Sequence, residues 1–196
     1  MARKGSYPKG DAKREEILER SLSVIAEQGF NGTSVKALAE AVGLSKAGLM
    51  HYFDSKEELF TAIIRKRDEV DQYRLVASID TFEEMREAYV ALVRHNAQVP
   101  GLVQLFSYLS VQAANPEHPA HDYFLWRSTG MRALWLYAIN RWKQTGQIRN
   151  DIDPESAARI IQATTDGMQL QWMIEPEVDM AKSVEVLLSL LADTSK

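Results

Sequence analysis

Apolar side chains recur at helical spacing along most of this 196-residue chain. In residues 11–28, for example, Ile17, Leu18, Leu22 and Ile25 fall three or four positions apart, which places them on one face of a helix. No run of alternating β-branched residues indicates a strand. The pattern therefore predicts an all-α fold.

Glycine, proline and capping residues divide this pattern into about nine helices. Ser55 and Thr81 are each followed three residues later by a glutamate, a capping box that starts a helix. Asp153 and Pro154 place a cap and then a proline at the first helical position. The expected helices cover residues 11–28, 34–41, 45–51, a stretch after Ser55, a stretch after Thr81, and residues 101–114, 120–145, 154–175 and 179–193.

The charge is distributed unevenly along the chain, whose net charge is −4. Residues 1–67 carry 12 Lys or Arg and 9 Asp or Glu, a balance of +3, whereas residues 68–196 carry 11 and 18, a balance of −7. We expect three parts, namely a flexible basic arm over residues 1–10, a small domain over 11–57 and a larger domain over 58–196. A basic first third on an acidic body is typical of a duplex-binding module joined to a body that does not bind DNA.

The basic residues near the start of the chain have two interpretations. They add phosphate or minor-groove contacts to a DNA complex, or they are a solvated tail without a role. Deleting residues 2–9 tests the first interpretation, because it should weaken DNA binding and flatten its salt dependence. The residues concerned are Arg3, Lys4, Lys9, Lys13 and Arg14.

Composition excludes several classes of protein. The chain has no cysteine, which excludes disulfides and thiolate metal sites. No stretch approaches the roughly 20 apolar residues of a membrane helix, and the first ten residues lack the apolar run of a secretory signal. We expect a cytoplasmic protein without a membrane partner.

Residues 35–52 have the features of a helix-turn-helix. The small Ala39 permits two short helices to cross closely, Gly43 tolerates the positive φ of the turn, and Ser45 can cap the second helix. Four apolar residues fall where the two helices would face a shared core, and these are Leu38, Val42, Leu44 and Leu49. The alternative is an ordinary helical hairpin with a glycine at its turn. The flanking residues 30–34 and 52–59 make the helix-turn-helix more specific.

With these flanks, the chain resembles the TetR/AcrR family of bacterial regulators. The resemblance is strong over residues 11–60. Beyond them the number and order of helices match, with a general likeness in Asp166-Gly167 and Glu175-Pro176 near the family's last two helices. It implies an all-α homodimer that places helix 45–51 in the major groove and pairs its last two helices with their symmetry mates. It also implies a small-molecule effector that binds in the larger domain and releases a repressor from a pseudo-palindromic, double-stranded DNA operator, and a nucleoid-associated location on DNA. The matching positions are Gly29, Phe30, Thr33, Ser34, Leu38, Ala39, residues 43–46, Leu49, residues 51–53, residues 55–57 and Leu59.

The second helix of this motif is expected to face the bases through Lys46, Ala47, Met50 and His51. Lys46 can donate to guanine O6 and N7 or to a phosphate, whereas Ala47 and Met50 can contact only apolar groups such as a thymine methyl. Gly48 allows the backbone to approach closely. The family often has tyrosine where this chain has Met50, which leaves the base preference at that position open.

Other residues are expected to hold the DNA backbone. Thr33, Tyr52 and Lys56 match family positions that contact phosphates, and Thr33 also fits a capping role. Ser34 and Ser45, at the starts of the two short helices, complete the expected DNA-binding set. Phosphate contacts position a protein on DNA, and base contacts select the sequence.

Large apolar side chains are abundant in residues 101–145 and 157–173, with polar groups among them. They form either a filled core or the apolar walls of a ligand site. If a pocket exists, we expect it to be lined by Phe106, Leu109, Trp135, Met168 and Trp172. The polar groups that could orient a ligand there are Gln112, Arg127, Thr164, Gln169 and Gln171.

Two apolar stripes at the end of the chain predict a four-helix dimer interface, unless they bury only against their own subunit. They comprise Ala157, Ile160, Ile161, Thr164 and Met168, followed by Val184, Leu187, Leu188 and Leu191.

No catalytic, cofactor or metal site is predicted. Pro116 and Pro119 interrupt any helix that would align His118 with His121, and no nucleophile elbow or phosphate loop is present. The alternatives to a ligand-released repressor are a DNA-binding regulator without an inducer and a helical ligand-binding protein that does not bind DNA.

Overall fold

The computed structural model describes residues 8–192, except the side chains of residues 8, 9, 70 and 72–74. Within this range the chain forms nine α-helices and no β-strand, which confirms the predicted all-α fold. The helices are α1 (Pro8–Gln28), α2 (Val35–Ala41), α3 (Lys46–Leu49), α4 (Lys56–Ala77), α5 (Phe82–Asn96), α6 (Pro100–Gln112), α7 (His121–Gln144), α8 (Pro154–Ile174) and α9 (Met180–Ser189). None of the described helices is long and apolar enough to cross a membrane.

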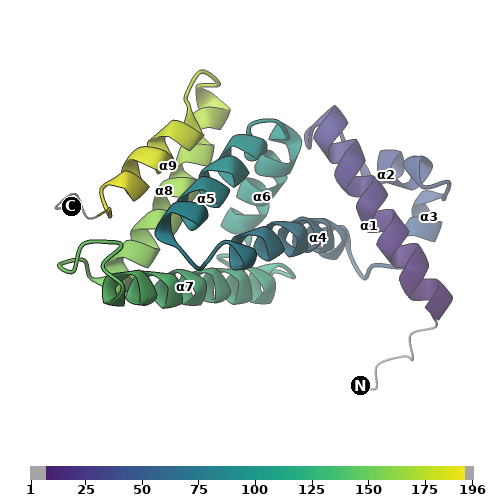
Figure 1. Ribbon diagram of the computed structural model, residues 1–196. Coiled ribbons are helices and arrows are strands. Elements are labelled where there is room, and N and C mark those ends of the chain that lie inside the picture. The colour runs from purple at the N-terminus through teal and green to yellow at the C-terminus, as the bar shows by residue number, and fades with distance from the viewer. Residues whose placement is uncertain (1–7, 193–196) are drawn as a thin grey trace.

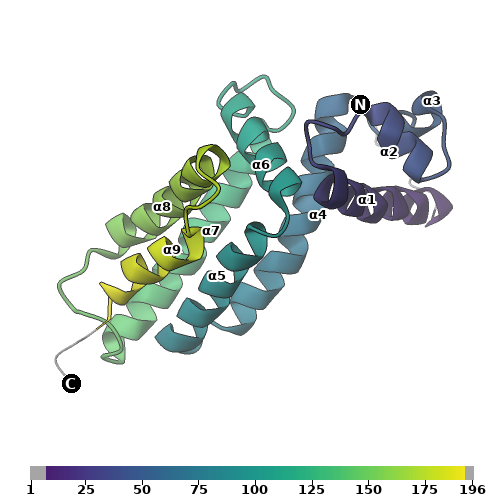
Figure 2. The same cartoon turned by 90° about the horizontal axis from the view of Figure 1, so that it is seen from above.

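The first three helices gather at one end of the molecule, and α8 and α9 lie side by side at the opposite end (Figures 1 and 2). The long helix α4 leads from the first group into the body formed by α4–α9. It packs against α1 near its start and against α5, α6 and α7 farther along. One continuous helix thus touches both groups.

The helix starts follow from local capping. The Ser55 and Thr81 hydroxyls accept hydrogen bonds from the amides of Glu58 and Glu84, at 2.9 and 3.1 Å. Asp153 caps α8 in the same way, through Ser156 N at 2.8 Å. Each cap satisfies an amide that has no partner within its helix.

Two hydrophobic cores stabilise the fold. The first joins α1–α3 to the beginning of α4 and also to α6, through Leu102, Leu105, Phe106 and Leu109. The second lies within the body and is centred on Trp135 and Trp142, which are fully buried. Because α6 contributes to the first core, the three N-terminal helices are packed directly onto the body.

Candidate nucleic-acid interface and body cavity

The α2–α3 segment folds as its small residues predict. Gly43 adopts a φ of +70° between the helices, and Ala39, where the helices approach, is only 1% exposed. Leu38 and Leu49 are completely buried. Ser34 and Ser45 cap α2 and α3 by accepting hydrogen bonds from Ala37 N and Gly48 N, at 3.1 and 3.0 Å.

Helix α3 exposes Lys46 and Ala47, and His51 just beyond its end is exposed as well. Met50 differs from the expectation that it faces outward, because it is half-buried and packs against the first core. Gly48 is also half-buried, and a Cβ there would lie 3.3 Å from Ser45 Oγ. The exposed surface of α3 is therefore smaller than predicted and is centred on Lys46.

Thr33 is part of the interior. It is 7% exposed, and its hydroxyl donates to Gly29 O at 2.6 Å. The residue that caps α2 is its neighbour Ser34. This geometry favours the structural role of Thr33, because the hydroxyl proton that a phosphate would accept is already used.

The start of α4 presents Lys56 to solvent beside the α2–α3 unit. The Lys56 ammonium lies 5.4 Å from the centre of the Phe60 ring. Glu58 accepts a hydrogen bond from Asp54 N at 2.6 Å and pairs with Arg14 of α1 at 3.1 Å. These contacts fix the entry of α4, where the free amides of a helix start favour an anion.

Helix α1 begins at Pro8, so residues 8–10 of the expected arm belong to a helix. Arg3 and Lys4 lie outside the described residues. Lys13 pairs with Glu16 at 2.7 Å, and Arg14 pairs with Glu58 and lies over the Phe53 ring. Lys13 and Arg14 thus belong to the folded helix, where Arg14 ties α1 to α4.

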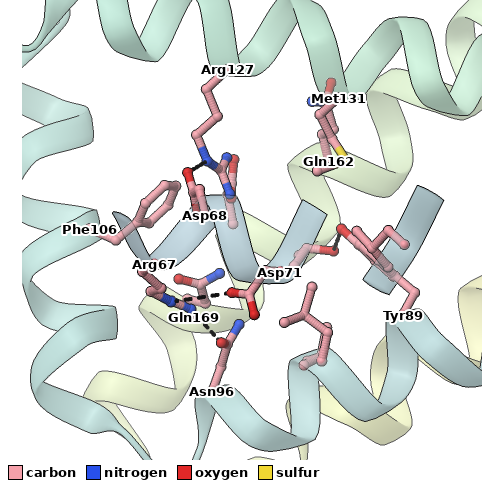
Figure 3. A pocket seen from close by; sticks show the side chains of 15 residues that line it. Arg67, Asp68, Asp71, Tyr89, Asn96, Phe106, Arg127, Met131, Gln162 and Gln169 are labelled. Atoms are coloured by element: carbon pink, nitrogen blue, oxygen red, sulfur yellow. Dashed lines mark hydrogen bonds and ion pairs between the residues drawn. The ribbon is translucent and has the colours of Figure 1, made fainter. Parts of the chain in front are cut away.

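A cavity of about 50 Å³ lies in the body between α4, α5, α6, α7 and α8 (Figure 3). Its lining combines charged and polar side chains with apolar ones such as Leu75, Val93 and Met131. Helix α4 contributes Arg67, Asp68 and Asp71, whereas α7 contributes Arg127. Tyr89 and Thr165 face it from α5 and α8, with their hydroxyl oxygens 3.0 Å apart. Burial raises the pKa of Tyr89 to about 12, so this hydroxyl keeps its proton at neutral pH.

The charges in this lining form two groups. In one, Asp68 accepts hydrogen bonds from the Tyr123 hydroxyl and from Arg127 Nε, the latter at 2.5 Å. In the other, Arg67 donates to Asn96 Oδ1 and lies 3.6 Å from Asp71. Both groups link α4 to other helices of the body.

Of the five residues expected to line a ligand site, Phe106 alone lines this cavity, and its ring stacks with the Arg127 guanidinium at 4.6 Å. Leu109 belongs to the first core and Trp135 to the second. Met168 and Trp172 are half-buried against the second core. Four of the five predicted residues therefore fill the cores, and the cavity is lined by charged and polar side chains together with other apolar ones.

Sequence reasoning missed most of these polar residues. Of the polar groups noted as ligand-orienting, Arg127 and Gln169 do line the cavity, whereas Gln112 and Gln171 are exposed elsewhere. A signal was present in helix α8, where four polar residues recur three or four positions apart and so share one face of the helix. These residues are Gln162, Thr165, Asp166 and Gln169.

Helices α8 and α9 expose several large apolar side chains, but these differ from the predicted stripes. Ile161 and Leu188, both assigned to those stripes, are 0–1% exposed because they pack inside their own subunit. Ile160 is exposed as predicted. The exposed apolar side chains of the two helices are Ile160, Leu170, Ile174, Val186 and Leu190.

The two nearby histidines contact the backbone. His121 Nδ1 lies 2.8 Å from Ala113 O, and His118 Nδ1 accepts a hydrogen bond from Ala120 N at 3.2 Å. No group of three or more potential metal-ligating side chains occurs within residues 8–192.

Comparison with known proteins relates the chain to bacterial regulators. Residues 17–63 match the family model for bacterial regulatory proteins of the tetR family. The transcriptional repressor KstR2 of Mycobacterium tuberculosis is 26% identical over 175 residues, which cover 83% of this chain and 82% of that protein. The repressor AcnR of Corynebacterium diphtheriae is 37% identical over 84 residues, covering 43% of this chain and 44% of the relative.

Solved structures show the same fold. A TetR-family regulator from Cytophaga hutchinsonii aligns with a TM-score of 0.74 at 19% identity, over 96% of this chain and 98% of that one. The matched family segment, residues 17–63, contains the entire α2–α3 unit described above and the start of α4. Residues 17–63 of this chain are therefore similar to the DNA-binding segment of the tetR family, and the chain is a helix-turn-helix, DNA-binding transcriptional regulator.

Proposed function

We propose that the protein is a homodimeric repressor that holds a pseudo-palindromic operator through α3 and releases it when a small effector enters the body cavity. The observation that carries the proposal is the exposure of Lys46 and Ala47 on a short helix that is anchored in the core by the completely buried Leu49. The repressor assignment is supported by relatives such as KstR2 and AcnR, which are named transcriptional repressors. The action is binding and release in the bacterial cytoplasm, without catalysis.

Within this proposal, some residues of α3 and its flanks contact the bases and others contact the phosphates. Lys46, Ala47 and His51 face the base edges, and Gly48 lets the backbone come close. Met50 reaches DNA only with the exposed part of its side chain. Phosphates are held by Lys56 and by polar groups at the helix starts. The supporting set is Thr33, Ser34, Ser45 and Tyr52, of which Thr33 acts mainly through the fold.

Dimerisation is supported by the exposed apolar side chains of α8 and α9. Ile174 is 80% exposed and Leu190 is 64% exposed, on adjacent helices at the end of the molecule far from α3. Several large apolar side chains exposed on two neighbouring helices are typical of an interface. Pairing two copies there joins two DNA-binding units in one symmetric particle.

Helix α4 connects the two proposed sites. It begins with Lys56 beside the DNA-binding unit and carries Arg67, Asp68 and Asp71 into the cavity wall. A ligand that rearranges these charged contacts changes the position of a helix that also packs on α1. Release of DNA then follows if the operator-bound arrangement has the lower affinity for the ligand.

The small volume of the cavity favours one alternative, which is a DNA-binding regulator without a small-molecule effector. At about 50 Å³ it is well below the roughly 300 Å³ at which ordinary ligand pockets begin. A regulator that responds to no small molecule would show such a small interior cavity. A second, more open hollow of about 310 Å³ lies beside Arg65, Asp122, Tyr123 and Trp126. Titrating effector candidates against the operator complex separates the two functions, since the proposed repressor loses operator affinity and the alternative does not.

The DNA-binding roles predict different results for two lysines. Lys46→Ala should cost roughly 1–3 kcal/mol on the operator and relax the preference at one base pair of each half-site. Lys56→Ala should weaken binding to operator and random DNA alike, and should reduce the salt slope by roughly 0.9 per lost phosphate contact. Fluorescence anisotropy with labelled duplexes over a range of salt concentrations measures both.

Lys182→Ala is the matched control, because it removes an exposed lysine on α9 at the opposite end of the molecule. It should leave operator affinity and salt slope unchanged. Equal losses on operator and random DNA for both Lys46→Ala and Lys56→Ala would contradict the assigned roles.

A further inference from the structure

One buried polar atom in the cavity has no partner. Gln169 is 5% exposed and lines the cavity, and its Oε1 accepts no hydrogen bond from the described residues. A buried acceptor without a donor is costly, and such groups in folded proteins are nearly always paired. Gln169 Oε1 therefore needs a hydrogen-bond donor, and a bound ligand can supply it.

The neighbouring hydroxyls do not offer that donor. Thr165 Oγ1 donates to Ile161 O at 2.9 Å, so its contact with Tyr89 uses the tyrosine proton. Each hydroxyl has only one proton to donate. Both side chains thus present acceptor lone pairs rather than donors to any further group.

The charges of the cavity lining also favour a ligand that donates hydrogen bonds and carries a positive charge. Two arginines, Arg67 and Arg127, face three carboxylates, Asp68, Asp71 and Asp166, which leaves one excess negative charge when all are ionised. Arg127 is bound to Asp68, and Arg67 lies beside Asp71. Asp166 has no hydrogen bond or ion pair with a described residue, and it lies on α8 three residues before Gln169.

From this arrangement, and resting on the effector half of the proposed function, we propose that the cavity binds the protonated amino group of a small organic ligand between Asp166 and Gln169 Oε1. An ammonium has three donors and no acceptor, which suits a site whose free groups are acceptors. The cavity volume of about 50 Å³ suits an ammonium with a short carbon chain.

The state of Asp166 supports the assignment. Asp166 lines the cavity and is exposed to solvent. Desolvation by the surrounding protein raises its pKa, the Arg127 charge opposes this shift, and the Asp68 charge adds to it. An ammonium beside Asp166 would offset the desolvation by supplying a counter-ion.

Met131 provides a local probe, because its side chain lines the same cavity. The experiment uses the full-length protein with ¹³C-labelled methionine methyl groups, and Met131→Leu identifies the relevant NMR signal. Propylammonium chloride, 1-propanol, sodium propionate and potassium chloride are titrated separately at constant ionic strength. We expect a saturable shift of the Met131 signal with propylammonium, in the millimolar range for so small a molecule, and no saturable shift with the other three.

Two variants test the contacts. Asp166→Asn and Gln169→Leu should each weaken propylammonium binding by about tenfold, since each removes one hydrogen bond to a charged group. Glu117→Gln, which removes an exposed carboxylate in the loop before α7, should leave binding unchanged. Melting temperatures of all variants confirm that they are folded.

The outcomes separate this inference from the proposed function. An equal response to 1-propanol or propionate, or unchanged binding in both cavity variants, overturns the ammonium site. An equal shift with potassium overturns it in favour of an inorganic cation, and no shift with any probe overturns it outright. If propylammonium binds as expected but operator affinity does not respond to any amine that moves the Met131 signal, the ammonium site stands and the effector half of the proposed function fails.

Discussion

Replacing Asp68 with alanine should lower the free energy of unfolding by about 3–5 kcal/mol. Asp68 is 9% exposed and accepts hydrogen bonds from both Arg127 Nε and the Tyr123 hydroxyl. Its removal leaves a guanidinium in the interior without a counter-ion, beside the Phe106 ring. The cost arises chiefly from this unpaired charge, because burying an ion without a partner is expensive.

Urea denaturation at one fixed protein concentration measures the effect, since the stability of a dimer depends on concentration. Asp80→Ala is the matched control. Asp80 pairs with Arg141 at 3.1 Å, but its side chain is 75% exposed, so its loss should cost less than about 1 kcal/mol. Similar losses for the two variants would show that Asp68 is not the counter-ion of a buried network.

Gly101→Ala should destabilise the protein by about 1–3 kcal/mol through overpacking at the junction between α1 and α6. A Cβ at Gly101 would lie 2.2 Å from Ile25 O and 2.7 Å from Gly29 Cα. Both are backbone atoms, so α1 must move away from α6. Because α1 also packs on α2 and α4, the added methyl should shift the DNA-binding unit relative to the body.

Gly130→Ala is the control for this substitution. Gly130 lies within α7, and a Cβ there would meet nothing within 4 Å. Alanine should therefore be neutral or stabilise the helix by up to about 1 kcal/mol. Differential scanning calorimetry of both variants measures the contrast, and an undiminished melting temperature for Gly101→Ala would contradict the close packing of α1 on α6.

The helices were predictable because their starts are encoded locally. Ser55, Thr81 and Asp153 each cap the helix that the sequence assigns to them. The α2–α3 unit was predictable for a related reason, since Ala39 and Gly43 satisfy steric requirements within a few residues of one another. The extent of α3 was not, and its regular helix ends at Leu49 rather than continuing to residue 51.

The cavity could not be located from the sequence because its walls come from five helices. Arg67, Asp68 and Asp71 fall on one face of α4 and look like an ordinary solvated stripe. Packing against α5, α6 and α7 places them inside the body. Trp135 was expected to line a pocket, but it is completely buried in the second core. A large aromatic residue suits a pocket wall and a core equally, so the sequence could not distinguish the two.

The central claim is that two copies of α3 read DNA in a fixed, symmetric arrangement. The most direct measurement is selection of binding sequences from a random duplex library by the purified full-length protein, at moderate salt. We predict enrichment of one pseudo-palindromic site whose half-sites lie about one helical turn, or a multiple of it, apart. Enrichment of a single unrepeated half-site, or no enrichment over the starting library, would contradict it.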